Sequence, residues 1–354
     1  MLGSGSVEER AVVSPTPRGL LTRFLNGSGV ELGPGHHPMP LPFPGVSVRY
    51  VDRWQPEENL ALFTNIEAGA TFPKPDIVAN LDVDRLSALP DESQDFVIAS
   101  HLLEHLADPL TQIDEIHRVL RPGAVVLVFL PDRRYTFDRK RSATPLAHLI
   151  AEHRERVTVV SDEHIEDYLR KTDVWDPSWT PEQEREQFEL NRQRSIHVHC
   201  WSEDEFLPVL EYTVLEMGMR WELLDAMFVE DVPGGFEFGF VLRRSPVAAE
   251  PAVMAEHLRL SWQVLASKSR QHAEAERQIA RLRALPGFPV MQRAWRVQRR
   301  LRQDLTRALD GTRAATVFSS GRRSLGLQHR RDRAHDEDQG KVGERVVEQH
   351  RRSV

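Results

Sequence analysis

Apolar residues of this 354-residue chain are concentrated in a strand–helix–strand pattern between residues 95 and 131. Residues 95–100 form a short apolar run, and residues 109–120 repeat apolar side chains at helical spacing. Arg121-Pro122-Gly123 predicts the end of that helix, because proline cannot continue it and glycine suits the position after its last turn. Residues 124–130 are a second apolar run. Two strands that are apolar on both faces and joined by a helix indicate a parallel sheet covered by helices.

Shorter apolar runs extend this unit in both directions along the chain. Upstream, the pattern predicts a short helix at residues 19–25, a turn at 26–29, strands at 30–32, 46–51 and 76–81, and a helix at 56–68. Downstream, Ser202 and Glu205 stand at capping-box spacing, so we expect a helix at 202–217, followed by strands at 220–230 and 236–242. The order predicts an α/β fold with a Rossmann-like, doubly wound sheet, mostly parallel, whose closing hairpin adds an antiparallel strand.

Residues 142–195 interrupt this order with three predicted helical stretches, and Trp175 and Trp179 lie between the last two. We expect this helical insertion to cover the acceptor side of the sheet. Tryptophan rings stack well on sugar faces, although simple packing explains them equally well.

Net charge divides the chain near Ser245. Residues 246–354 contain 22 Lys and Arg against 12 Asp and Glu, whereas residues 1–245 contain 24 against 41. We therefore predict a flexible N-terminus at 1–26, a main domain at 27–245, a helical extension at 246–310 and a disordered tail at 311–354.

The helical extension is basic and partly amphipathic. Residues 252–285 form a long polar helix with partial heptads, and residues 290–309 form a second helix with one apolar face and six arginines. Residues 252–310 could lie on an anionic membrane surface, dock on the acidic domain or bind a partner helix, and we favour a membrane surface or protein partner. Few aromatic residues accompany the arginines, which argues against nucleic acid.

Bulk composition points to the cytoplasm. No apolar run approaches the roughly 18 residues that span a bilayer, and the first residues lack the pattern of a secretory signal. A single cysteine, Cys200, excludes an internal disulfide and a cysteine-built metal site. We expect a cytoplasmic protein that binds peripherally at the inner face of the membrane if the extension contacts lipid.

A glycine turn between two predicted strands suggests a nucleoside site. Gly33 and Gly35 would let the backbone approach a ligand, and Asp52, at the end of the second strand, could accept both hydroxyls of a ribose. Two glycines also suit an ordinary tight turn. A dinucleotide needs a helix N-terminus for its pyrophosphate, but Pro38 stands where the third glycine would be. S-adenosylmethionine, which carries no phosphate, is therefore favoured over NAD.

Four stretches resemble one family when they are taken together. In order, ELGPG, RYVD, LPDESQDFVIASHLLEHLADP and IHRVLRPGAVVLVFLPD are similar to class I S-adenosylmethionine-dependent methyltransferases. More narrowly, they resemble the bacterial set (methyltransferase-11-like) associated with surface-polysaccharide and glycosyltransferase genes. The likeness covers about residues 27–243. It departs from the family in the truncated first helix and at Ala124, where a second glycine is common.

The resemblance implies a set of cofactor residues. Glu31, Gly33 and Gly35 would line the methionine end of S-adenosylmethionine, and Asp52 would bind the ribose diol. Asn80 to Asp82 would lie near the adenine. Ser100 and His101 would lie where the methyl donor meets the acceptor.

Methyl transfer to a hydroxyl benefits from a general base, and histidine is the natural candidate. His101 and His105 flank Glu104 at the end of the predicted fourth strand. They could supply a base, form a divalent-metal site like that of some quinone-modifying methyltransferases, or simply buttress the turn. We expect no metal, because no further ligand is identifiable.

Four more residues are candidates for the acceptor side. His197 and His199 alternate in IHVHCW, so in a strand they point the same way, as a catalytic and a substrate-binding residue or as a polar edge. His164 lies in an acidic helical stretch that could cover the site. Arg133 and Arg134 follow the fifth strand and could hold an anionic acceptor, although a solvated charge run is the simpler interpretation.

Two functional hypotheses follow. The first is a methyltransferase that O-methylates a sugar, glycan or related envelope precursor. The second is a non-catalytic scaffold that keeps the fold and recruits biosynthetic partners or a membrane through its basic helical tail.

Overall fold

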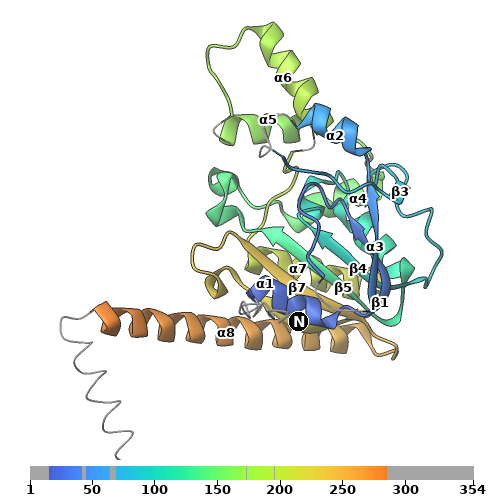
Figure 1. Cartoon of the computed structure of the whole chain (residues 1–354), viewed down its shortest axis with the longest axis vertical. Coiled ribbons are helices and arrows are strands. Elements are labelled where there is room, and N and C mark those ends of the chain that lie inside the picture. Colours follow the sequence, from blue (N-terminus) through green and yellow to red (C-terminus); the bar gives the residue numbers. More distant parts are fainter. Residues whose placement is uncertain (1–15, 42–44, 64–68, 173, 195, 285–354) are drawn as a thin grey trace, which may run out of the picture. The chain divides into compact units, whose positions relative to one another are not determined.

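The computed structural model describes residues 16–41, 45–63, 69–172, 174–194 and 196–284 (Figure 1). The chain divides into two compact units, Met1–Glu276 and Arg277–Val354. The predicted second basic helix at 290–309 and the predicted tail at 311–354 lie outside the described residues, as do residues 1–15 of the predicted N-terminus.

A seven-stranded sheet in the order β3-β2-β1-β4-β5-β7-β6 forms the first unit. Its strands are β1 (Gly27–Leu32), β2 (Val46–Asp52), β3 (Ile77–Val78), β4 (Gln94–Ser100), β5 (Leu120–Pro131), β6 (Trp221–Met227) and β7 (Glu237–Arg244). Strands β1 to β5 pair in parallel, and β7 is antiparallel to both β5 and β6. The predicted Rossmann-like fold class is confirmed.

The helices are α1 (Pro17–Leu21), α2 (Pro56–Leu62), α3 (Pro109–Val119), α4 (Leu146–Glu155), α5 (Asp162–Lys171), α6 (Pro181–Arg194), α7 (Glu203–Leu215) and α8 (Pro251–Ala284). Short 3-10 turns lie at Thr22–Phe24, Leu103–His105, Arg133–Tyr135, Phe137–Lys140 and Val229–Asp231. The predicted insertion contains α4, α5 and α6. No helix in the described part of the chain has both the length and the apolar character needed to cross a lipid bilayer.

Each central strand buries side chains on both faces, which explains the uninterrupted apolar runs. In β4, Val97 and Ala99 join the larger hydrophobic core, whereas Phe96 and Ile98 join a separate cluster on the opposite face. The larger core includes residues of α3, α7 and α8, and the smaller includes Leu21 of α1. The strand–helix–strand prediction for residues 95–131 therefore holds in type and order.

Two local predictions were wrong at the first strand and the third. The predicted turn at 26–29 is mostly strand, since β1 starts at Gly27 and Gly29 pairs with Phe96. A Cβ atom at Gly29 would lie 2.2 Å from the Phe96 carbonyl oxygen, so this glycine serves close strand packing and not a turn. The predicted strand at 76–81 is reduced to Ile77–Val78.

Helix α8 packs on the main core, so the predicted boundary near Ser245 falls inside the first compact unit, which runs to Glu276. Trp262 is 2% exposed, and its ring centroid lies 5.5 Å from that of Phe228 and 5.9 Å from that of Phe240. Leu258 is also buried in this core. Only six of the 22 Lys and Arg residues that suggested a boundary belong to α8, whose other face is apolar.

Candidate active site

Two cavities meet at the carboxyl ends of β1, β2 and β4. The first has a volume of about 260 Å³ and the second about 560 Å³. Gly33, Gly35 and His101 line both of them. Both glycines have positive φ angles, +57° and +55°, so the backbone turns between the cavities in a conformation that favours glycine. Ligands bound in the two cavities would therefore meet beside His101.

The first cavity contains the predicted nucleoside residues Asp52, Asn80 and Asp82. The Asp52 carboxylate accepts the Trp54 backbone N–H at 3.2 Å, and burial raises its pKa above the ordinary range. The Asp82 carboxylate accepts the Ala107 N–H at 2.8 Å, and burial raises its pKa to about 6.

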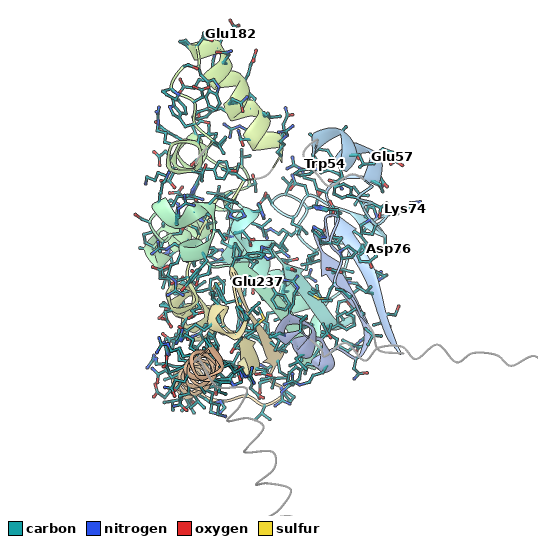
Figure 2. The ribbon with its side chains drawn as sticks, turned by 60° about the vertical axis from the view of Figure 1, so that its left-hand side comes forward. Trp54, Glu57, Lys74, Asp76, Glu182 and Glu237 are labelled. Carbon is teal, nitrogen blue, oxygen red and sulfur yellow. The ribbon has the colours of Figure 1, made fainter. Side chains whose placement is uncertain are left out.

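Aromatic side chains that the sequence analysis missed also line the first cavity: Trp54, Phe63 and Phe72. Phe63 and Phe72 stack with ring centroids 6.3 Å apart. Trp54 lies at the junction of β2 and α2 (Figure 2). Trp54 could have been predicted, because it follows the acidic end of β2 by two residues. Phe72 could not, because it comes from a loop with no periodic pattern.

Half of the residues that line the second cavity have polar or charged side chains. Ser100 and His101 were predicted there, whereas Arg18 and Glu237 were not. Arg18 forms an ion pair with Glu237, donates to the Ser100 Oγ at 2.7 Å and lies over the Phe129 ring. Glu237 (Figure 2) begins β7, which pairs antiparallel with β5, the neighbour of β4, so its approach to His101 depends on the sheet order.

His101 lies at the junction in a strained conformation with φ +51°. Its Nε2 is 2.8 Å from the Glu237 Oε2, and its Nδ1 is 3.4 Å from the Glu104 Oε1. Burial opposes protonation, but hydrogen bonds and charge from these two carboxylates outweigh it and raise the pKa of His101 to about 9. At neutral pH His101 is therefore a hydrogen-bond donor held between two acids.

Comparisons with known proteins agree with this geometry. Residues 32–128 match the family described as "Methyltransferase domain" (Methyltransf_11). This stretch of the chain is therefore similar to a methyltransferase domain.

A probable S-adenosylmethionine-dependent methyltransferase of Mycolicibacterium smegmatis is 48% identical to the chain over 58 residues. That match spans 16% of this chain but only 22% of the relative's length. Among solved structures, the PH0226 protein of Pyrococcus horikoshii has 14% identity and a TM-score of 0.36, covering 64% of this chain and 86% of its own. An S-adenosylmethionine-dependent methyltransferase of Methanosarcina mazei has 16% identity and a TM-score of 0.35, covering 64% and 97%.

Glu31, directly before the matched stretch, lies beneath the proline-rich loop and outside the lining of both cavities. It is 1% exposed, and its two carboxylate oxygens accept the Met39 N–H at 2.9 and 3.2 Å. Burial raises its pKa to about 7, against the opposing effects of this hydrogen bond and of Arg18. Glu31 thus fastens the loop that replaces the first helix, and its predicted cofactor contact stays a prediction.

We expect the Glu31→Gln variant to change the pH dependence of stability. The Glu31 carboxyl has a raised pKa in the folded protein, so its contribution is present below about pH 4.5 and is lost as pH rises to about 7. The difference between a pKa of 4.5 in the unfolded chain and about 7 in the folded protein corresponds to about 3 kcal/mol of stability. Urea unfolding of both proteins should be measured at pH 4.5 and 7.5. Between these two values, the free energy of unfolding of the variant should rise by up to that amount relative to that of the wild type. Parallel pH profiles would contradict the buried, proton-binding state of Glu31.

The remaining predicted residues lie outside both cavities. Arg133 forms a two-pronged ion pair with Glu205, and Arg134 forms one with Asp132. Neither arginine lines the first or the second cavity, so the structure does not bring them to the predicted acceptor position.

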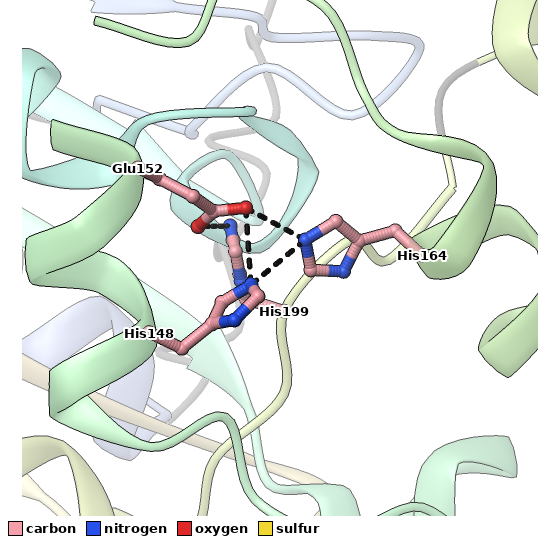
Figure 3. Close-up of side chains that lie close together, drawn as sticks. All are labelled: His148, Glu152, His164 and His199. Atoms are coloured by element: carbon pink, nitrogen blue, oxygen red, sulfur yellow. Dashed lines mark hydrogen bonds and ion pairs between the residues drawn. The ribbon is translucent and has the colours of Figure 1, made fainter. Parts of the chain in front are cut away.

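The predicted histidines divide between two clusters. The His197 Nδ1 is 2.6 Å from the Asp138 Oδ2, and its ring packs edge-on against His105, whose Nδ1 is 2.8 Å from the Ile196 carbonyl oxygen. The side chains of His105, His197 and the fully buried Glu104 converge within 4.8 Å, next to the first cavity. His164 of the insertion and His199 instead meet each other (Figure 3), and neither lines the first or the second cavity.

Proposed function

We propose that this chain transfers the methyl group of S-adenosylmethionine to a hydroxyl of a sugar, glycan or related envelope precursor. The observation that carries the proposal is the junction of two cavities at His101, one suited to a nucleoside and the other to a polar acceptor. In-line transfer needs the methyl and the acceptor oxygen aligned, and adjoining cavities supply this proximity.

The first cavity fits the cofactor in the chemistry of its lining. The Asp52 carboxylate can accept two ribose hydroxyls, and Trp54, Phe63 and Phe72 offer apolar surface for an adenine ring. The described loop that follows β1, residues 33–41, contains no helix whose N-terminus could hold a phosphate. Such a site suits a nucleoside without phosphates, and when bound the sulfonium supplies an electrophilic methyl group.

The second cavity supports a hydroxyl-rich acceptor. Arg18, Ser100 and Glu237 present donors and acceptors toward a space of about 560 Å³, roughly twice that of the first cavity. Neighbouring hydroxyls of a sugar can use both kinds of group at once. The methyl carbon–sulfur bond breaks as the carbon–oxygen bond forms, the electron pair remains on sulfur, and the hydroxyl proton passes to a base.

We assign the base role to the neutral form of His101. Because Glu104 and Glu237 raise the His101 pKa to about 9, the fraction of neutral imidazole grows as pH rises toward that value. We therefore expect kcat/KM for O-methylation to increase about tenfold per pH unit below pH 9 and then level off.

The test incubates the full chain with methyl-labelled S-adenosylmethionine and a panel of sugar nucleotides and oligosaccharides. Label should enter the sugar fraction, with a pH profile that rises to about 9 and is lost in His101→Gln, whereas the exposed control His272→Gln should retain activity. Cofactor binding with label only in amines or carboxylates would overturn the acceptor class. Absence of cofactor binding would favour the scaffold hypothesis.

A further inference from the structure

Three histidines and one glutamate converge where the helical insertion meets the segment before α7. His148 and Glu152 lie on α4, His164 lies on α5, and His199 lies in the segment before α7 (Figure 3). One ligand atom from each falls within 4.8 Å of all the others. We propose that these four side chains bind one zinc-class divalent metal ion.

The interatomic distances suit a tetrahedral ion. The His148 Nε2 lies 3.1 Å from the His164 Nε2 and 3.0 Å from the Glu152 Oε1. The His164 Nε2 lies 2.7 Å from that same oxygen, and the His199 Nε2 lies 3.6 Å from the Glu152 Oε2. Four ligands at about 2.0–2.1 Å from a tetrahedral zinc stand roughly 3.3 Å apart, which is the middle of this range.

Buried polar atoms without hydrogen-bond partners give a second reason to propose a metal ion at this cluster. His199 is 0% exposed, and among the described residues neither of its ring nitrogens has a hydrogen-bond partner. The Glu152 Oε2 is also buried without a partner. Such groups cost free energy when left unsatisfied, and a cation shared by the four side chains would bind one ring nitrogen of His199 and a carboxylate oxygen of Glu152.

The residue types select the class of ion. Three imidazoles with one carboxylate suit zinc and its transition-metal neighbours, whereas magnesium and calcium prefer oxygen ligands. A cavity of about 240 Å³, lined in part by His148 and His164, gives a route from solvent. With four protein ligands, the ion would have a structural and not a catalytic coordination.

Binding would join helices α4 and α5 of the insertion to the segment before α7, beside the active site. The backbone N–H groups of Val198 and His199 donate to the Glu104 carbonyl oxygen at 2.7 and 3.1 Å. Glu104 follows β4 and its carboxylate faces His101, so a metal at His199 would hold α4 and α5 against the end of β4. The proposal stands apart from the methyl-transfer reaction and departs from the sequence-based expectation of no metal.

The test measures metal content of the full chain after dialysis against zinc and then against buffer. We expect about one zinc per chain in the wild type, and visible d–d absorption when cobalt replaces zinc. His148→Gln and His164→Gln each remove one partly exposed ligand and should weaken zinc binding roughly 100-fold or more. His153→Gln, on the same helix but facing Asp108, is the matched control and should bind zinc as the wild type does.

A chelator should lower the melting temperature of the wild type and of His153→Gln but not of the two ligand variants. Fewer than about 0.1 zinc per chain in folded wild type, or equal zinc affinity in all four proteins, would overturn the proposal. S-adenosylmethionine binding by calorimetry in the same samples separates this result from a failure of the proposed function.

Discussion

Asp52→Ala should bind S-adenosylmethionine about 100-fold more weakly than the wild type. The Asp52 carboxylate stands at the end of β2 in the first cavity, where it can accept both ribose hydroxyls. Hydrogen bonds to a charged group contribute about 1.5–3 kcal/mol each, so the loss of two costs about 3 kcal/mol, or two orders of magnitude in Kd. Titration calorimetry measures the change directly.

Two further variants make the Asp52 result specific. Asp52→Asn keeps one acceptor oxygen and the side-chain volume, so we expect an intermediate affinity. Glu57→Ala removes an exposed carboxylate on the adjoining helix α2 and should leave Kd within about twofold. Equal affinity of Asp52→Ala and the wild type would show that the first cavity is not the nucleoside site.

Trp262→Ala should lower the free energy of unfolding by about 3–5 kcal/mol, the usual cost of removing a large buried aromatic side chain. Trp262 lies within α8, and its ring contacts those of Phe228, just before the 3-10 turn Val229–Asp231, and Phe240 of β7. The value is measured by urea unfolding followed through circular dichroism.

The matched control for Trp262 lies two residues further along the same helix. Val264 is 52% exposed, so Val264→Ala should change stability by no more than about 0.5 kcal/mol. If Trp262→Ala also costs less than about 1 kcal/mol, α8 is an appendage and the boundary near Ser245 stands. A large cost in Trp262→Ala alone shows that residues beyond 245 complete the main core.

Local patterns were sufficient for most of the sheet. The apolar runs predicted β4 and β5, and helical spacing predicted α3 to within one residue of its end at Val119. Ser202 and Glu205 form the expected capping box at the start of α7. These features depend on neighbours a few residues away, so a single sequence carries them.

Contacts between residues far apart in the sequence could not be predicted from local patterns. Glu237 is 136 residues from His101, and the side chains meet only because β7 inserts antiparallel beside β5. Glu31 turns under the proline-rich loop to Met39, although its position in the motif suggested a cofactor contact. The buried stripe of α8 was masked by the charged residues of its solvent face.

By itself, the sequence determined the Rossmann-like sheet, the glycine turn with its acidic strand end, and the resemblance to methyltransferases. Tertiary structure alone decided which side chains share a site: Arg18 and Glu237 beside His101, and His148, His164 and His199 around Glu152. Periodicity reports which face of an element is apolar, and this follows from neighbours along the chain. Which polar groups converge depends on how helices and strands that are distant in the sequence pack together, and a local sequence pattern does not contain that information.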